Sequence, residues 1–317
     1  MKICVVIPVM NERPTLDRLV QDIIEHIAPH RYRIIFVDDG STDDSWGEMQ
    51  RLCRAYPHVE AIRFARNLGK TAALDAAFRE VDGDLVLTMD ADLQDDPAEI
   101  PRLIQKLDEG HDMVCGWKAT RHDPWHKTIP SRLFNATIGA VFGLRLNDIN
   151  TGFKLMRTRV AKGLVLFADM HRMVAVQAHE QGWDVVEIPV THHPRRFGRS
   201  KFGLERIYRG FRDAYVVWLM YRCKGGPARR FGARAALCFA AALGTLAVEY
   251  GAGRSTSPET LLSPAASWGI AALTALACAF IAAGTALLAL GAGGQLLLRK
   301  LPEAPVEYPV LDRIGGE

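Results

Sequence analysis

The segment from Leu85 to Pro97 joins an apolar run to a cluster of carboxylates and one amide. If the apolar run is a buried strand, its two-residue period sends Asp90, Asp92 and Gln94 to one side as the chain leaves the sheet. Three oxygen-bearing side chains at the end of a strand suit a hard divalent cation such as Mg²⁺ or Mn²⁺. The alternative is an acidic turn before a helix, because Asp96-Pro97 is also a good helix N-cap.

Apolar strands and helical patterns alternate through the first part of the chain. Strands are expected at residues 2–8, 32–37, 59–64, 85–89 and 112–116, with helices at 14–28, 70–79 and 97–107. This alternation indicates a parallel sheet covered on both faces, and such sheets bind ligands outside the carboxyl ends of their strands. Polar clusters occupy that position after the first four strands, at residues 11–12, 38–39, 67–70 and 90–94. Their shared position favours a binding site over an isolated helix cap.

Several classes of chemistry are disfavoured. The chain has no G-x-G-x-x-G after its first strand, no G-x-x-x-x-G-K-[ST] and no G-x-S-x-G, which argues against dinucleotide, P-loop and serine acyl-transfer enzymes. Six cysteines without paired spacing argue against a disulfide framework or a zinc site. His192 and His193 also lack metal-ligand spacing and are interpreted as structural or surface residues. A basic belt between Arg195 and Arg234 is contiguous with hydrophobic helices, and Phe197 alone among its first arginines is not a stacking platform, so no nucleic acid partner is expected.

Two apolar runs near the C-terminus predict membrane helices. Residues 265–298 carry no charge, and this run is longer than the roughly 20 residues that cross a bilayer. Residues 235–248 reach spanning length only if Arg234 and Glu249 lie at the two interfaces; the alternative is a buried alanine-rich helix. Basic residues flank the outer ends of both runs, whereas the loop between them has only Arg254. This bias predicts a hairpin with both flanks in the cytoplasm.

The sequence predicts four segments. These are a catalytic domain at 1–202, an amphipathic juxtamembrane segment at 203–230, transmembrane helices at about 231–252 and 268–298, and a flexible cytoplasmic tail at 301–317. The juxtamembrane helix has arginines opposite its apolar face, which is typical of a helix on an anionic leaflet, although packing on the soluble domain is the alternative. Gly284, Gly291 and Gly294 would permit close helix packing, including a homo-oligomer. No signal peptide opens the chain, so we expect a multi-pass protein of the cytoplasmic (inner) membrane whose catalytic domain faces the cytoplasm.

Together, the motifs resemble a known family. Residues 8–12, 37–43, 67–70 and 90–95, which read P-x-x-N-E, V-D-D-G-S-T-D, N-x-G-K and D-A-D-L-Q-D, resemble family 2 glycosyltransferases of the GT-A fold. N-T-G-F-K at 150–154, His171-Arg172 and R-x-x-G-x-S-K at 195–201 are similar to the polyprenyl-phosphate glycosyltransferases. That group includes dolichyl-phosphate mannose synthase and bacterial undecaprenyl-phosphate glucosyltransferases. The resemblance covers about residues 3–222 and implies an α/β catalytic domain of GT-A type, Rossmann-like with a mostly parallel sheet.

The resemblance also implies a reaction and a set of residues. The reaction is an inverting, metal-dependent transfer of a hexose from a nucleotide diphosphate sugar, of the UDP-glucose or GDP-mannose type, to a polyprenyl phosphate. By the same analogy Asp92 and Gln94 bind Mg²⁺ or Mn²⁺ with Asp90 close by, and Asp90 and Asp92 take part in catalysis. Arg132 receives the acceptor phosphate together with Arg121. The other substrate-binding residues implied are Pro8, Glu12, Asp39, Lys70, Arg195, Ser200 and Lys201.

The chemistry of a phosphate acceptor agrees with this interpretation. A phosphate monoester is already largely a dianion at neutral pH, so it needs positioning and cations rather than a strong general base. Asp148 could orient the sugar or serve as a weak base, and both roles stay open. Transfer to a glycolipid or polysaccharide hydroxyl is a same-fold alternative that would need a better-placed base. A non-catalytic membrane scaffold is an alternative of another class, and it predicts loss of the metal ligands.

Overall fold

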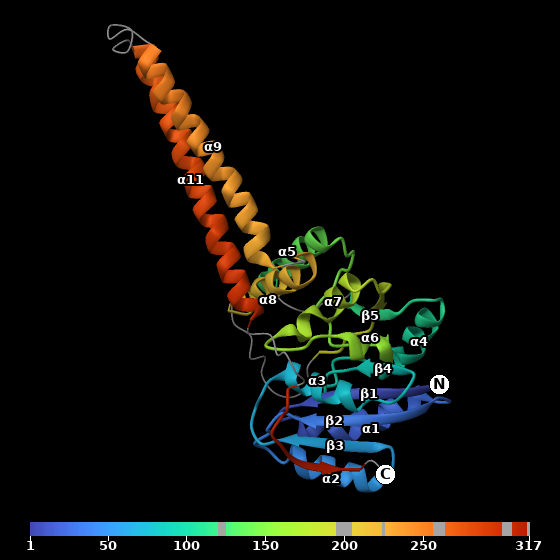
Figure 1. The fold of residues 1–317 in the computed structure, drawn as a ribbon. Coiled ribbons are helices and arrows are strands. Elements are labelled where there is room, and N and C mark those ends of the chain that lie inside the picture. Colours follow the sequence, from blue (N-terminus) through green and yellow to red (C-terminus); the bar gives the residue numbers. More distant parts are fainter. Residues whose placement is uncertain (120–124, 195–204, 224–225, 256–263, 300–305, 316–317) are drawn as a thin grey trace. The chain divides into compact units, whose positions relative to one another are not determined.

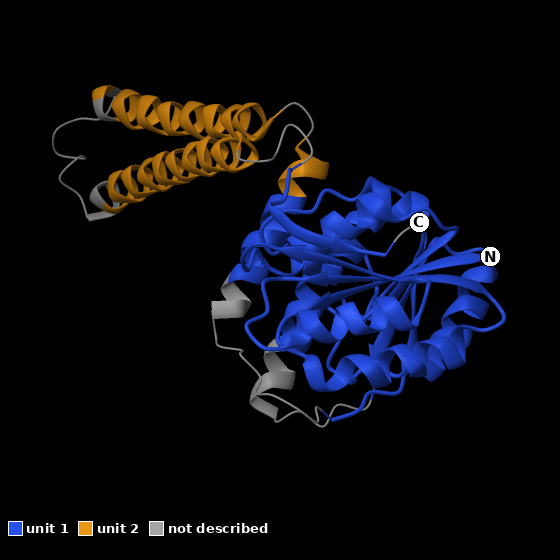
Figure 2. Cartoon of the chain, turned by 90° about the horizontal axis from the view of Figure 1, so that it is seen from below, with its two compact units in different colours: residues 1–217, 302–317 blue, residues 218–301 orange. Residues whose placement is uncertain are grey.

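The computed structural model describes residues 1–119, 125–194, 205–223, 226–255, 264–299 and 306–315. The chain divides into two compact units, one of residues 1–217 with 302–317 and one of residues 218–301 (Figure 2). The first unit therefore includes both the N-terminal part of the chain and its C-terminal segment.

Among the described residues, eight strands form one mixed sheet in the order β7-β5-β6-β4-β1-β2-β3-β8 (Figure 1). Their bounds are β1 Lys2–Val9, β2 Arg31–Asp38, β3 Val59–Phe64, β4 Leu85–Thr88, β5 Met113–Lys118, β6 Lys154–Arg157, β7 Val185–Val190 and β8 Val310–Ile314. Parallel pairing joins β1 to β2 and β4, β2 to β3, and β5 to β7. β6 runs antiparallel to β4 and β5, and β8 runs antiparallel to β3. The five expected strands all form, whereas β6 and β8 were not expected from the sequence.

The helices of the first unit lie on both faces of this sheet. They are α1 Arg13–Ile27, α2 Ser45–Ala55, α3 Lys70–Glu80, α4 Ile100–Asp108, α5 Trp125–Phe142, α6 Thr158–Gly163 and α7 Val174–Glu180, with 3-10 turns η1 Pro97–Glu99 and η2 Met170–Met173. Helix α8, Glu205–Arg222, belongs to the first unit as far as Val217. From β1 to β3 the strand order advances in one direction, and the chain then returns past β1 to form β4. Because crossovers are right-handed, this reversal puts α3 on the face opposite α1 and α2. The sheet therefore has its topological switch point between β1 and β4, where ligands bind in such folds.

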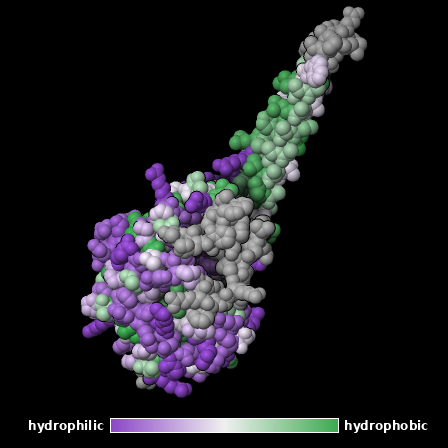
Figure 3. Space-filling view, turned by 180° about the vertical axis from the view of Figure 1, so that it is seen from behind, coloured by the Kyte–Doolittle hydropathy of each residue, from purple (hydrophilic) through white to green (hydrophobic). Residues whose placement is uncertain are grey.

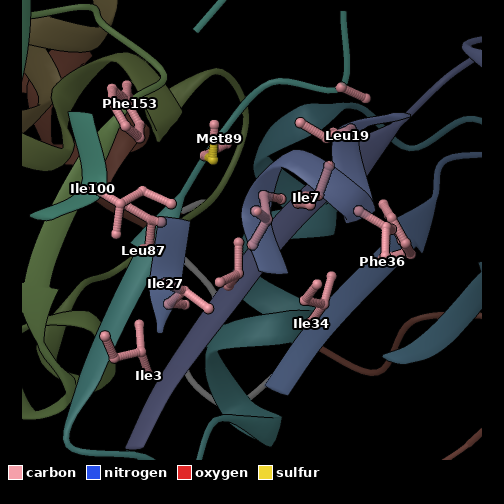
Figure 4. Packing of buried hydrophobic residues seen from close by; sticks show 14 of the residues in the cluster. Ile3, Ile7, Leu19, Ile27, Ile34, Phe36, Leu87, Met89, Ile100 and Phe153 are labelled. Carbon is pink, nitrogen blue, oxygen red and sulfur yellow. The ribbon is translucent and has the colours of Figure 1, made fainter. Parts of the chain in front are cut away.

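The hydrophobic core fixes the strand ends that carry the polar clusters. On α1, Leu16, Leu19, Ile23 and Ile27 recur at helical spacing, and all four are fully buried. Figure 4 shows Leu19 and Ile27 with apolar residues of the neighbouring strands, such as Ile7. Each large aliphatic side chain removed from water contributes about 1.5–3 kcal/mol before entropy is counted.

The C-terminal segment corrects one expectation. The sequence predicted a flexible tail at 301–317, but β8 adds to the free edge of β3 with Ala61 opposite Ile314 and Phe64 opposite Val310. The backbone groups on the edge of β3 gain hydrogen-bond partners by this pairing, which gives a physical reason for the tail to be ordered there.

The described part of α8 packs on the first unit. Phe211 meets Phe134 of α5 edge to face, with ring centroids 5.2 Å apart. Arg209 and Arg212 each lie 3.7 Å from Asp169, and Asp213 beside them is buried. The first unit accordingly extends to Val217, beyond the catalytic domain boundary expected at 202. These contacts favour the alternative in which the basic amphipathic helix packs on the soluble domain.

The second unit is built around two long apolar helices. They are α9 Pro227–Ser255 and α11 Pro264–Leu298, and the stretches Pro227–Ala252 and Trp268–Leu298 are long and apolar enough to cross a membrane. Figure 3 shows that the visible surface of these helices is mostly hydrophobic. Leu237 and Leu243 are 71% and 68% exposed, which disfavours a buried alanine-rich helix.

Two glycines of α11 lie against side chains of α9. A Cβ on Gly284 would lie 2.9 Å from the ring of Phe239, and one on Gly291 would lie 3.0 Å from Phe231. The small residues thus let the two helices approach each other closely. An oligomer that uses the same glycines stays a prediction.

Candidate active site

The turns after β1 and β2 are locked together by Asn11. Its backbone N–H donates to Ser41 Oγ at 3.0 Å, and its Oδ1 accepts from the backbone N–H groups of Thr42 and Asp43 at 2.7 and 3.2 Å. Asn11 has a φ of +59°, a conformation that asparagine tolerates better than most residues. These bonds hold Glu12, the residue after Asn11, next to the end of β2. Pro8 is opposite Val37 on the adjoining strands.

The two aspartates at the end of β2 have different surroundings. Asp38 is fully buried and accepts a hydrogen bond from Ser41 N at 2.9 Å, so it serves the turn. The carboxylate of Asp39 accepts from Leu68 N at 2.6 Å and from Gly69 N at 3.0 Å. Burial raises the pKa of Asp39, and the two amide bonds oppose this shift. Asp39 therefore holds the loop between β3 and α3.

Lys70 and Asp90 form an ion pair at the switch point. Lys70 is the first residue of α3, and its ammonium group hydrogen-bonds to the Asp90 carboxylate just after β4. Burial by itself would raise the pKa of Asp90, but the charges of Lys70 and Lys118 outweigh it, so the pKa lies well below its usual range. Asp90 is therefore an anion at any physiological pH.

The loop that carries Asn150 and Gly152 closes against Asp90. Thr88 Oγ1 donates to Gly152 O at 2.7 Å, and a Cβ on Gly152 would lie 2.8 Å from the Asp90 carboxylate. A glycine at this position therefore lets the loop approach the carboxylate. Lys70, Asn150 and Gly152 are among the residues that line a pocket here, together with Pro8.

Two basic residues of this pocket were missed as individual site residues in the sequence. Lys154 is buried within β6 and donates to Thr151 O, and burial lowers its pKa. His171 shares a hydrogen bond of 2.8 Å between its Nδ1 and Thr71 Oγ1. Burial and the nearby charge of Lys70 hold the pKa of His171 well below its usual range, so the ring is neutral at pH 7. The position of Lys154 between Phe153 and Leu155 in an apolar strand could have indicated a site residue, because a buried lysine needs a partner for its charge.

The donor atoms after β4 fit a hard divalent cation. Asp92 Oδ1 accepts from Gln94 N at 3.2 Å, and Gln94 Nε2 donates to His193 O at 3.4 Å. Because the amide nitrogen of Gln94 is committed to His193, its Oε1 stays available as an acceptor. Carboxylate and amide oxygens are the ligands that Mg²⁺ and Mn²⁺ prefer. Among the described residues no group of three His, Cys, Asp or Glu side chains is close enough to hold a metal ion. The proposed ligands differ from such a group because one of them, Gln94, is an amide.

The acidic residues that follow do serve as a helix start. Asp96 Oδ1 accepts from Ala98 N at 3.0 Å, which caps η1 before α4. His193 Nε2 lies 2.9 Å from Asp96 Oδ2, and His192 pairs with Asp95 in a β-bridge. The cap and the metal interpretation are thus compatible, and the two histidines are structural residues of this loop.

The residues expected to meet the acceptor are only partly described. Arg132 is exposed on α5, and in the part of the chain that the structure describes no acidic group is paired with it. Asn135, one turn along, donates to Asn147 O at 2.5 Å and so fixes α5 beside the buried Asp148. The other four expected residues lie outside the residues described with side chains: Arg121, Arg195, Ser200 and Lys201.

Comparison with known proteins agrees with this arrangement. Residues 4–171 match the model of a family described as glycosyl transferase family 2. The chain is 33% identical over 239 residues to a dodecaprenyl-phosphate galacturonate synthase of Rhizobium johnstonii, covering 73% of this chain and 71% of that protein. It is 36% identical over 209 residues to an undecaprenyl-phosphate 4-deoxy-4-formamido-L-arabinose transferase of Edwardsiella ictaluri, covering 65% of this chain. The chain spans 64% of the length of this second relative, just under two thirds.

Solved structures share the fold. Glucosyl-3-phosphoglycerate synthase from Mycobacterium tuberculosis, crystallised with Mn²⁺ and UDP-glucose, superposes with a TM-score of 0.51 at 19% identity, over 69% of this chain and 78% of that one. Its complex with phosphoglyceric acid gives a TM-score of 0.52 at 18% identity, over 69% of this chain and 79% of that one. At this identity the likeness shows the fold alone, and it confirms the expected GT-A class of mixed α/β sheet.

Proposed function

Because the chain belongs to glycosyl transferase family 2, we propose that it transfers a hexose-type sugar from a nucleotide diphosphate sugar to a polyprenyl phosphate, with inversion and with a divalent metal. The observation that carries this proposal is the Lys70–Asp90 ion pair at the switch point, followed directly along the chain by Asp92 and Gln94. Both relatives compared above are named for transfer to a polyprenyl phosphate, which supports the same acceptor here.

The donor half of the site is built from the first four strand ends. Asp39 would contact the nucleoside, with Pro8 and Glu12 beside it. Asp92 and Gln94 would hold Mg²⁺ or Mn²⁺ with Asp90 close by, and the ion would act as a Lewis acid for the departing diphosphate. The Lys70 ammonium stands where it can neutralise charge on the diphosphate as well as on Asp90.

The acceptor half must bring a second anion close to the donor. Two unit charges about 4 Å apart interact by about 4 kcal/mol at an effective dielectric constant of 20, so a phosphate dianion needs cations to approach a diphosphate. Arg132, exposed on α5, is the described residue that would receive it, with Arg121 as its proposed partner. The phosphate oxygen is itself the nucleophile, so no strong general base is required, and the buried Asp148 could orient the sugar or serve as a weak base.

The proposed membrane arrangement is a hairpin with both flanks in the cytoplasm. Its support comes from the connectivity of the chain, because β8 follows the second apolar helix yet pairs with β3, which precedes the first. A chain that returns to the same sheet must cross the membrane an even number of times. Arg230 and Arg234 near the start of α9 are on the side that the positive-inside rule assigns to the cytoplasm. The exposed rings of Tyr250 and Trp268 suit the opposite interface.

The test is a transfer assay with the full chain in nanodiscs. Labelled UDP-glucose and GDP-mannose, together with other nucleotide sugars, are supplied with polyprenyl phosphate and either Mg²⁺ or Mn²⁺. We expect label in the lipid fraction with at least one donor, loss of that label in EDTA, and loss in Asp92→Asn. Absence of metal-dependent transfer from every donor would refute the proposal.

A further inference from the structure

The C-terminal segment, residues 306–314, contacts β3, the first residue of the β3–α3 loop, and α3 beyond the loop. Pro309 O accepts a hydrogen bond of 2.9 Å from Ala65 N, directly after β3. β8 then pairs with β3 itself. The segment therefore fixes the point at which the loop leaves the sheet.

Tyr308 fixes the other side of the same loop. Its ring stacks on Phe64 with centroids 5.4 Å apart and planes inclined by 28°. Its hydroxyl donates to Asp75 Oδ2 at 2.7 Å, and Asp75 is a buried residue of α3. Burial and this bond raise the pKa of Tyr308 above its usual value, so the hydroxyl keeps its proton at neutral pH. One side chain thus links the last residue of β3 to the second turn of α3.

Arg79 closes the contact. Its guanidinium group lies 5.5 Å from the centre of the Tyr308 ring, pairs with Asp75, and donates to Val306 O at 2.7 Å. A cation over an aromatic face is attracted by the ring, and a hydrogen bond from a charged donor is stronger than one between neutral groups. The segment is therefore held by side chains as well as by its strand pairing.

The loop that is fixed in this way belongs to the donor site. Between Ala65 and α3 lie Leu68 and Gly69, whose amides bind the Asp39 carboxylate, and α3 begins with Lys70, which binds Asp90. Gly69 has a φ of +95°, which glycine adopts easily, but glycine has no Cβ and can adopt many other backbone conformations as well. Such a loop needs restraint from outside if Asp39 and Lys70 are to be preorganised.

We propose that residues 306–314 are a positioning element for the nucleotide-sugar subsite, acting through Tyr308 on the β3–α3 loop. This rests on the proposed function only in assigning that subsite to the donor. The contrasting view is that β8 merely covers an exposed sheet edge. In that case Tyr308 would add to the stability of the whole unit without a specific effect on the loop.

Hydrogen exchange on the full chain in detergent separates the two views. In Tyr308→Ala we expect the amides of Leu68 and Gly69 to exchange at least about tenfold faster, which corresponds to about 1.4 kcal/mol of local stability, while α1 amides such as that of Ile23 are unchanged. Tyr308→Phe keeps the ring on Phe64 and loses the bond to Asp75, so its loop should exchange at an intermediate rate. Leu311→Ala is the matched control, because Leu311 lies in β8, three residues after Tyr308, and is 62% exposed.

A binding measurement then tests the consequence for the ligand. Isothermal titration with UDP and with GDP in the presence of Mn²⁺ should show about tenfold weaker nucleotide binding in Tyr308→Ala and wild-type binding in Leu311→Ala. Unchanged loop exchange in Tyr308→Ala, or equal acceleration at Ile23, overturns the positioning role. If the wild type binds neither nucleotide, the proposed function fails instead, and the exchange measurement still decides the role of the segment.

Discussion

Gly152 and Asp90 are packed so closely that a methyl group on Gly152 would stand 2.8 Å from the Asp90 carboxylate. The glycine of the N-T-G-F-K motif is therefore explained by the carboxylate it faces, rather than by a turn that needs a positive φ. Gly152 allows Thr88 to bind the loop backbone while Asp90 stays on Lys70.

Replacing this glycine should displace Asp90. In Gly152→Ala we expect transfer activity to fall at least about tenfold, since displacements of about 1 Å at a site can cost more than that. The melting temperature should change little, because the strain falls on one side chain. Gly244→Ala, a helical glycine with nothing within 4 Å of the added methyl group, is the control and should keep wild-type activity. Full activity in Gly152→Ala would show that the position of Asp90 is unimportant.

Lys70 should compete with a metal ion for Asp90 in the absence of nucleotide. In Lys70→Met, Mn²⁺ binding to the free protein should tighten by at least about tenfold, because two unit charges about 6 Å apart interact by about 3 kcal/mol at a dielectric constant of 20, and a tenfold change needs only about 1.4 kcal/mol. Nucleotide binding should weaken in the same variant, because a cation for the diphosphate is lost. Electron paramagnetic resonance of free Mn²⁺ measures the first effect. Lys162→Met, at an exposed lysine of α6, should change neither quantity, and unaltered Mn²⁺ affinity in Lys70→Met would contradict this account.

The neutral His171 should make the fold sensitive to mild acid. The pKa of His171 is lowered in the folded protein, whereas an unfolded histidine titrates near 6.5, so below about pH 6.5 the unfolded state binds a proton that the folded state does not. Stability should therefore fall as the pH drops from about 6.5 towards the folded pKa, by at most about 1.4 kcal/mol per pH unit for one proton.

Melting curves of the full chain between pH 7.5 and 5.5 test this. His171→Asn retains a side-chain hydrogen-bonding group near Thr71 but cannot titrate, so its melting temperature should depend less on pH than that of the wild type. His58→Asn, at an exposed histidine, should follow the wild type. Identical pH dependence in His171→Asn and the wild type would rule out His171 as the source.

The membrane hairpin predicts opposite locations for two reporters. A reporter inserted after Thr256, between the two apolar helices, should report the far side of the membrane. A reporter fused after Glu317 should report the cytoplasm, because residues 306–315 join the sheet of the first unit. Two cytoplasmic signals would refute the hairpin.

The sequence predicts the central part of this structure well, because strong local patterns and tertiary packing agree there. The strands β1 to β5 are apolar runs ended by polar residues, and their parallel order follows from the alternation with helices. The same topology predicts that the four polar strand ends lie together at one edge of the sheet. The role of Asp96 as a helix cap was also predicted from the sequence, because Asp followed by Pro favours a helix start through local interactions alone.

The missed elements depend on contacts between distant segments. β6 has only four residues, and β8 contains Asp312 and Arg313, so neither has a clear apolar period. β8 forms because the edge of β3 is available, which no local pattern records. The same applies to the ion pair of Lys70 with Asp90, whose partners are 20 positions apart in sequence and meet only because α3 packs on β1, the strand that pairs with β4.

The most direct measurement of the central claim is the mass spectrum of the lipid product. The full chain in nanodiscs receives a nucleotide sugar, Mn²⁺, and an equal mixture of polyprenyl phosphate and the matching free polyprenol. We predict that the mass of one sugar residue is added to the polyprenyl phosphate alone, and that Asp92→Asn adds none. Addition to the polyprenol hydroxyl, or to neither lipid with any donor, would contradict the account.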